Sequence, residues 1–174
     1  MKTKTLVRMA LLIAIGIALP QLLSQVPQIR ALISPMHIPV LIAGLVLGPI
    51  PGVIVGVVTP LLSHVLFLMP MTAGLPGMTL ELGIYGLTSG LFMMFFKDKL
   101  PEMPRIYVSL ILAMLCGRIA GGLLNAFVLK AGNYSISMWV AGYITGTAVG
   151  SIAYVIFIPI IVRALRKAGL SEVK

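Results

Sequence analysis

The sequence predicts an all-α membrane protein: a single domain, residues 1–174, of six transmembrane helices in a compact bundle with both termini cytoplasmic. Composition is the first observation, because 59% of the residues are hydrophobic and only 10% are charged. A soluble domain is about half apolar and about a quarter charged. This chain has too few polar side chains to cover a surface in water. An ordinary cytosolic enzyme is thereby excluded, and we expect lipid to be the main solvent.

Six apolar segments, separated by polar or helix-breaking residues, are the second observation. We place them at residues 5–24, 38–48, 53–69, 78–96, 105–129 and 137–162. A helix needs about 20 mostly apolar residues to cross a bilayer. Five segments come near that length, but the second is only about 17 Å long as a helix and is short enough to be re-entrant.

The boundaries of the segments follow from local signals. The first segment begins among basic residues, as a secretory signal peptide does, but its apolar stretch is longer and residues 25–30 offer no small-x-small cleavage site. We therefore expect a retained helix. The second ends at a cluster of glycine and proline at residues 48–52, which breaks helices. Loops at 70–77, 97–104 and 130–135 separate the remaining segments.

The distribution of basic residues is the third observation. Ten of the 13 Lys and Arg residues fall at the two termini or after the second and fourth segments: Lys2, Lys4, Arg8, Lys97, Lys99, Arg105, Arg163, Arg166, Lys167 and Lys174. Only Arg30 and Lys130 fall in the predicted outer loops. Because Lys and Arg collect in cytoplasmic loops, this predicts cytoplasmic termini. It also explains the net charge of +9 without a nucleic-acid partner.

Arg118 is the one cation left within a predicted span. A charge near the middle of a bilayer costs about 2.5–3.5 kcal/mol, so its side chain is expected to face the bundle interior or a wet cavity. Asn125 and Gly122 share its helix face. This polar stripe favours a ligand pocket over a structural arginine paired with backbone carbonyls or with Glu81.

Glu81 is the only acidic residue in a predicted span, and Tyr85 lies one turn further on the same face. Counted from the helix ends, Arg118 lies about 10 Å deeper than Glu81, so a polar ligand bridging the two is as natural as a direct ion pair. Alternatively, Glu81 is an interfacial residue at the start of its helix, where a negative charge meets the helix dipole favourably.

Other polar and aromatic residues near the outer side are candidate binding residues. Trp139, Tyr143 and Thr147 recur every four positions in the last segment, as an interfacial belt or as a stacking surface for a ligand. Asn133 lies in the preceding loop, and we place His37 in an outer loop that joins a lid. His64, in the third segment, is also a candidate binding residue, although packing is its commoner role.

Small residues also recur every four positions, a pattern that lets helices pack closely. They are Gly142, Gly146 and Gly150 in the sixth segment and Ala10, Ala14 and Ala18 in the first. We find no catalytic motif, and Cys116 has no histidine at an obvious spacing. We therefore expect no enzyme activity, no metal site and no catalytic residue.

Three stretches of the sequence resemble the substrate-binding S components of energy-coupling factor (ECF) vitamin transporters. They are the alanine series of the first segment, the run PMHIPVLIAGLVLGP at residues 35–49 with its continuation to residue 60, and the run LPGMTLELGIYGL at residues 75–87. The length, the six segments and the cytoplasmic N-terminus also fit, so the resemblance covers nearly the whole chain.

The resemblance implies a multi-pass protein of the prokaryotic cytoplasmic membrane, surrounded by lipid, that binds a vitamin at the outer side of a six-helix bundle. The loop between the first two helices would act as a lid. Its partners would be a transmembrane coupling protein and two cytoplasmic ATPases, so ATP is used by the partners and this chain holds no cofactor. Ala10 and Ala14, with Ala18 as an extension, would form the docking surface for that module.

The substrate is predicted less directly. The HIPVL run at residues 37–41 is most similar to the pantothenate-type branch of the family. Arg118 suits a carboxylate ligand through charge-assisted hydrogen bonds, and Glu81 could accept from hydroxyl or amide groups. The alternative substrates are pyridoxal or pyrimidine precursors and cobalamin. The alternative functions are a self-sufficient channel or ion-coupled carrier, and a membrane enzyme or assembly factor.

Overall fold

The protein is a bundle of roughly antiparallel helices, and the computed structural model describes residues 3–23, 34–129, 135–145 and 148–173. These residues contain no strand. The elements are α1 (Thr3–Leu22), α3 (His37–Leu47), α4 (Pro49–Phe67), α5 (Leu75–Phe95), α6 (Glu102–Leu124), the π-helical η2 (Asn125–Leu129), α7 (Ile136–Trp139), the π-helical η3 (Val140–Thr145) and α8 (Ala148–Lys167).

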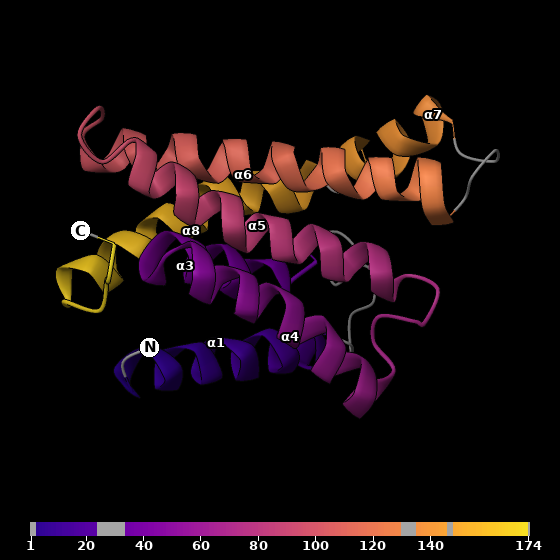
Figure 1. Cartoon of the computed structure of the whole chain (residues 1–174), viewed down its shortest axis with the longest axis horizontal. Coiled ribbons are helices and arrows are strands. Elements are labelled where there is room, and N and C mark those ends of the chain that lie inside the picture. The colour runs from indigo at the N-terminus through magenta and orange to yellow at the C-terminus, as the bar shows by residue number, and fades with distance from the viewer. Residues whose placement is uncertain (1–2, 24–33, 130–134, 146–147, 174) are drawn as a thin grey trace.

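Five of these helices are long and apolar enough to cross a membrane, and α3 is the short one with 11 residues. The described ends of the chain lie at the same end of the bundle (Figure 1). Basic residues gather there, at the start of α1, between α5 and α6, and at the end of α8. We call this the basic end, and the other the opposite end. The arrangement agrees with a multi-pass membrane protein.

The short helix α3 occupies the centre of the bundle, where every one of its residues except Ile38 is buried. It packs against α1, α4, α5 and α8. A helix that is apolar on all sides is stable when protein covers every side. Because α3 is only about 16 Å long and ends at the basic end, its first residue, His37, lies deep inside the bundle.

Gly48 alone connects α3 to α4, and it adopts a positive φ of 104° that favours glycine. Of the predicted breaker cluster at residues 48–52, only Gly48 breaks the helix. Pro49 and Pro51 lie in the first turn of α4, where the missing N–H of proline costs no hydrogen bond. Pro76 likewise lies in the first turn of α5. The third and fourth predicted segments correspond to α4 and α5. These helices therefore begin four and three residues earlier, respectively, than the sequence predicts.

Glycines bring the backbones of α3, α4 and α5 into direct contact. A Cβ atom at Gly52 would overlap the backbone of Gly86, and one at Gly86 would overlap the backbone of Gly52. Gly56 approaches the carbonyl of Leu82 in the same way, and Gly44 approaches Gly86. We call the mutual contact of Gly52 and Gly86 the glycine seam. It holds α5 close to α4.

The predicted sixth helix, residues 137–162, is wrong as a single regular helix. The segment starts with α7, continues as the π-helical η3, and α8 then runs on to Lys167, so Arg166 and Lys167 belong to its last turn. Cations are favourable at the carboxyl end of a helix. The predicted packing face also fails at Gly142, where an added Cβ would meet no atom of another described element within 4 Å, whereas Gly150 is buried. Gly146 lies outside the described residues.

Candidate functional site

Polar side chains from four helices meet inside the apolar bundle. We call them the polar cluster: His37 from α3, Glu81 and Tyr85 from α5, Arg118 from α6, and Ser151 and Tyr154 from α8. Burying such groups is costly unless each finds a hydrogen-bonding or charged partner. The contacts between them therefore decide what the cluster can do.

Glu81 is at the centre of the polar cluster. The Tyr85 hydroxyl donates a hydrogen bond of 2.7 Å to Glu81 Oε1, and His37 Nε2 lies 3.9 Å from the same oxygen. The side chain of Glu81 is only 13% exposed, and α5 has no acidic residue in its first turn. The alternative that Glu81 serves the start of its helix is therefore wrong. Glu81 is an interior carboxylate held by two polar neighbours.

His37 lies between two aromatic rings and not in an outer loop, which corrects the sequence-based placement. It is the first residue of α3 and is 8% exposed. Its ring centroid is 5.4 Å from that of Tyr85 and 6.0 Å from that of Tyr154. Its Nδ1 contacts the Ser34 carbonyl oxygen at 2.9 Å, and the Tyr154 hydroxyl donates to the same oxygen at 2.9 Å. The chain entering α3 is thus fixed to α8 beside His37.

Arg118 reaches the polar cluster from α6. Its Nη2 donates to the hydroxyl of Ser151, which precedes Tyr154 by three residues on α8. The predicted depth difference of about 10 Å from Glu81 is wrong. A Cβ at Gly117, the neighbouring residue, would lie 3.2 Å from the Glu81 carbonyl oxygen, so the backbones that carry the two charged side chains are at one level. The count placed Glu81 too close to its helix end, because α5 begins at Leu75, three residues before the predicted start at residue 78.

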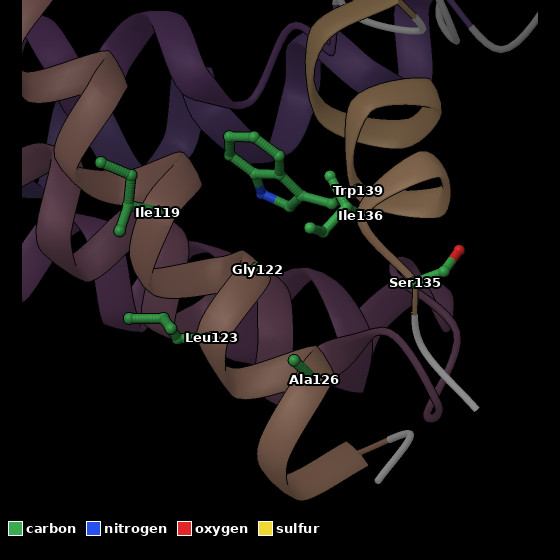
Figure 2. Close-up of a pocket in the computed structure, with 7 residues that line it drawn as sticks. All are labelled: Ile119, Gly122, Leu123, Ala126, Ser135, Ile136 and Trp139. Atoms are coloured by element: carbon green, nitrogen blue, oxygen red, sulfur yellow. The ribbon is translucent and has the colours of Figure 1, made fainter. Parts of the chain in front are cut away.

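Trp139 packs on α6 beside Arg118. Its Nε1 donates to the Arg118 carbonyl oxygen at 3.2 Å, and its indole covers Gly122 so closely that a Cβ there would overlap it. Figure 2 shows the indole reaching toward α6 at a groove between α6 and α7. The groove holds about 260 Å³ and is lined by Ile119, Gly122, Leu123, Ala126, Ser135, Ile136 and Trp139. Trp139 therefore couples α7 to the backbone that carries Arg118.

The remaining predicted residues do not join the polar cluster through the contacts described. Asn125 Nδ2 donates to the Gly121 carbonyl at 2.9 Å, where α6 becomes η2. His64 Nδ1 contacts the Pro70 carbonyl oxygen at 2.7 Å near the end of α4. Tyr143 belongs to η3, but its side chain lies outside the described part of the chain, as does Asn133 altogether. Their roles in binding stay predictions.

Sequence reasoning missed Ser151, Tyr154 and the carbonyl of Ser34. The spacing of four that links Trp139, Tyr143 and Thr147 continues to Ser151, so following it one step further would have found the partner of Arg118. Tyr154 lies nearly one turn beyond Ser151. Nothing in the sequence indicates the Ser34 carbonyl.

Chemically, the polar cluster offers one positive and one negative side chain, an imidazole and three hydroxyl groups. This set can pair with a small molecule that carries both an anionic group and hydroxyl or amide groups. Among the residues that the structure describes, no three His, Cys, Asp or Glu side chains gather to form a metal site.

We expect Gly122→Ala to displace the Trp139 indole from α6, because the added methyl group occupies its position. Trp139 is the only tryptophan, so its fluorescence reports on this contact directly. The emission of the variant should shift to the red and be quenched more strongly by acrylamide. Gly142→Ala is the matched control, since a Cβ at Gly142 meets nothing within 4 Å. Identical spectra for the two variants would contradict the packing of Trp139 on Gly122.

Comparison with known proteins assigns the family. The family model described as "ECF transporter, substrate-specific component" matches residues 4–173. Neither the curated proteins nor the solved structures yield a match to the chain. The family match spans all the helices of the bundle, including those that supply the polar cluster. A multi-pass bundle with an interior charged site agrees with a subunit that binds a small molecule for transport. The chain belongs to the family of substrate-specific components of ECF transporters.

Proposed function

We propose that this chain captures a small carboxylate-bearing vitamin, with pantothenate as the best candidate, and delivers it across the membrane with an ATP-driven ECF module. The observation that carries the proposal is the polar cluster, in which Arg118 and Glu81 lie at one level inside the bundle. Family membership supplies the class of activity, a substrate-binding transport subunit without its own catalysis.

Arg118 is the proposed carboxylate-binding residue. A guanidinium group has five N–H donors, and the Ser151 hydroxyl is one of the partners of Arg118. A carboxylate beside it would form charge-assisted hydrogen bonds in a site screened from water. Glu81, Tyr85 and His37 lie opposite and are proposed to bind the hydroxyl or amide groups of the ligand. Pyridoxal or pyrimidine precursors and cobalamin are the alternative substrates.

We also propose the outer face of α1 as the docking surface for the coupling protein. The buried residues of α1 are Thr5, Met9, Gly16 and Pro20, which face the bundle. Ala10, Ala14 and Ala18 are all exposed, on the side turned away from it. Small side chains let a partner helix approach closely, which is the basis of helix association in lipid. The basic end of the bundle would then face the cytoplasmic ATPases.

Affinity capture from native membranes tests this function. We expect the tagged wild-type chain to bring down one integral membrane protein and two ATPases, and Ala14→Leu to reduce that capture at least about tenfold because its side chain blocks close helix contact. Its thermal stability should stay near wild type, since Ala14 is exposed. Ala164→Leu, the same change at an exposed position of α8, is the control. Capture of no ATPase, with transport by the isolated chain in ATP-free liposomes, would support a self-sufficient carrier instead.

A further inference from the structure

The chain after α8 folds back across the basic end of the bundle. We call residues Ala168–Val173 the C-terminal strap. Gly169 has a positive φ of 71°, its N–H donates to the Arg166 carbonyl at 3.0 Å, and the Leu170 N–H donates to the Leu165 carbonyl at 3.0 Å. These two bonds make a Schellman motif, which ends a helix and reverses the chain. The strap is therefore directed back toward α1 and α3.

The strap donates hydrogen bonds to a backbone carbonyl at the carboxyl end of α3. The backbone N–H groups of Glu172 and Val173 donate to the Val46 carbonyl at 2.8 and 3.3 Å, and the Ser171 hydroxyl donates to it at 3.2 Å. The last carbonyls of a helix have no partner within that helix. The side chain of Val173 is buried and would lie 3.5 Å from a Cβ at Gly48. The strap thus covers the junction between α3 and α4.

The same strap binds α1. The Thr5 hydroxyl donates to Glu172 Oε1 at 2.6 Å, and Arg8 Nη1 donates to the Leu170 carbonyl at 2.9 Å and contacts Glu172 Oε1 at 3.4 Å. Thr5 is only 2% exposed. Removing the strap partner of such a buried hydroxyl leaves it without a hydrogen-bond acceptor, which is costly. Glu172 therefore joins the first turns of α1 to the end of α3.

The far end of the strap is fixed as well. Arg166 Nη1 donates to the Val173 carbonyl at 2.7 Å, and Arg166 Nε donates to Glu102 at 2.9 Å. The strap is consequently held from two sides. On one side α1 binds Leu170 and Glu172, and on the other Arg166 of α8, itself paired with Glu102 of α6, binds Val173.

We propose that the C-terminal strap positions α1 for partner docking, by fixing its first turns to the α3–α4 junction. Apolar side chains do not drive helices together in lipid, where the tails are equally apolar, so polar ties and close packing determine how firmly α1 is held. Thr5 and Arg8 precede Ala10 and Ala14 by about half a turn to two and a half turns on a continuous helix, so motion at the strap would move the alanine face. This inference rests on the proposed docking function of that face.

Glu172→Ala tests the strap in the full-length chain, with Asp98→Asn as the control that removes a carboxylate from the loop between α5 and α6 at the same end. Hydrogen–deuterium exchange is measured over residues 3–10, together with capture of the ATPases and titration with pantothenate. We expect exchange in this segment to rise about tenfold, as for the loss of a hydrogen bond to a charged group. Capture should fall several-fold, while pantothenate binding stays at the wild-type level.

The outcomes separate the two proposals. Wild-type exchange over residues 3–10 in Glu172→Ala would overturn the strap, and so would faster exchange with unchanged capture. Thr5→Val, which keeps the side-chain shape and removes only the donor, should reproduce the faster exchange if Glu172 acts through Thr5. Failure of the wild-type chain to capture any ATPase would instead reject the docking function, and the exchange data would still decide whether the strap holds α1.

Discussion

Gly86→Ala is expected to lower the unfolding temperature of the purified protein by roughly 6–12 °C, the shift that about 3 kcal/mol produces in a chain of this size. The methyl group would overlap the backbone carbonyl of Gly52 across the glycine seam. A side chain in the way can rotate, but a backbone atom cannot, so α4 and α5 have to move apart. Thermal unfolding in detergent, followed by circular dichroism, measures the shift.

Gly83→Ala is the matched control for this variant, because it places the same methyl group one turn earlier on α5. The nearest atom there is a Val57 methyl group at 3.2 Å, on a side chain that can adjust. We expect a shift of at most a few degrees. If Gly83→Ala and Gly86→Ala destabilised the protein equally, the close backbone contact between α4 and α5 would be contradicted.

Arg118→Ala is expected to weaken pantothenate binding about 100-fold, since hydrogen bonds to charged groups contribute roughly 1.5–3 kcal/mol each and Glu81 would lose its opposite charge. Isothermal titration of purified wild type and variant measures the difference. The emission of Trp139, which bonds to the Arg118 carbonyl and not to its side chain, shows whether the site keeps its fold.

Two comparisons make the Arg118 experiment decisive. Arg163→Ala removes an exposed cation from α8 near the basic end and should bind like the wild type. No heat with the wild-type protein would reject pantothenate as the substrate. Heat with the wild type and unchanged affinity in Arg118→Ala would keep the substrate and reject Arg118 as its carboxylate-binding residue.

The sequence was sufficient for features that depend on composition and local pattern. The scarcity of charge made Arg118 and Glu81 visible as interior residues, and the structure brings them, with Tyr85 and His37, into one cluster. The short second segment was equally readable, because the apolar run at residues 38–48 has only 11 residues and ends in GPIPG at residues 48–52. These are properties of single helices.

What the sequence could not supply is the relative position of different helices. The level of Arg118 against Glu81 depends on how α6 packs against α5, and the depth of His37 depends on α3 ending at the basic end. Ser151 and Tyr154 join the polar cluster only because α8 packs beside α3 and α6. Such information comes from the packing of the bundle and not from hydropathy or spacing.

The enclosed helix α3 has a consequence for how the protein is made. With 11 residues it falls short of the roughly 20 that an independent span requires, so it does not enter the bilayer as a separate unit. A single glycine joins it to α4, so we expect the two to insert together as a hairpin during synthesis. The first residue of α3, His37, is not covered by Tyr85 and Tyr154 until α5 and then α8 are inserted. The polar cluster is thus completed last, when the final helix has been inserted.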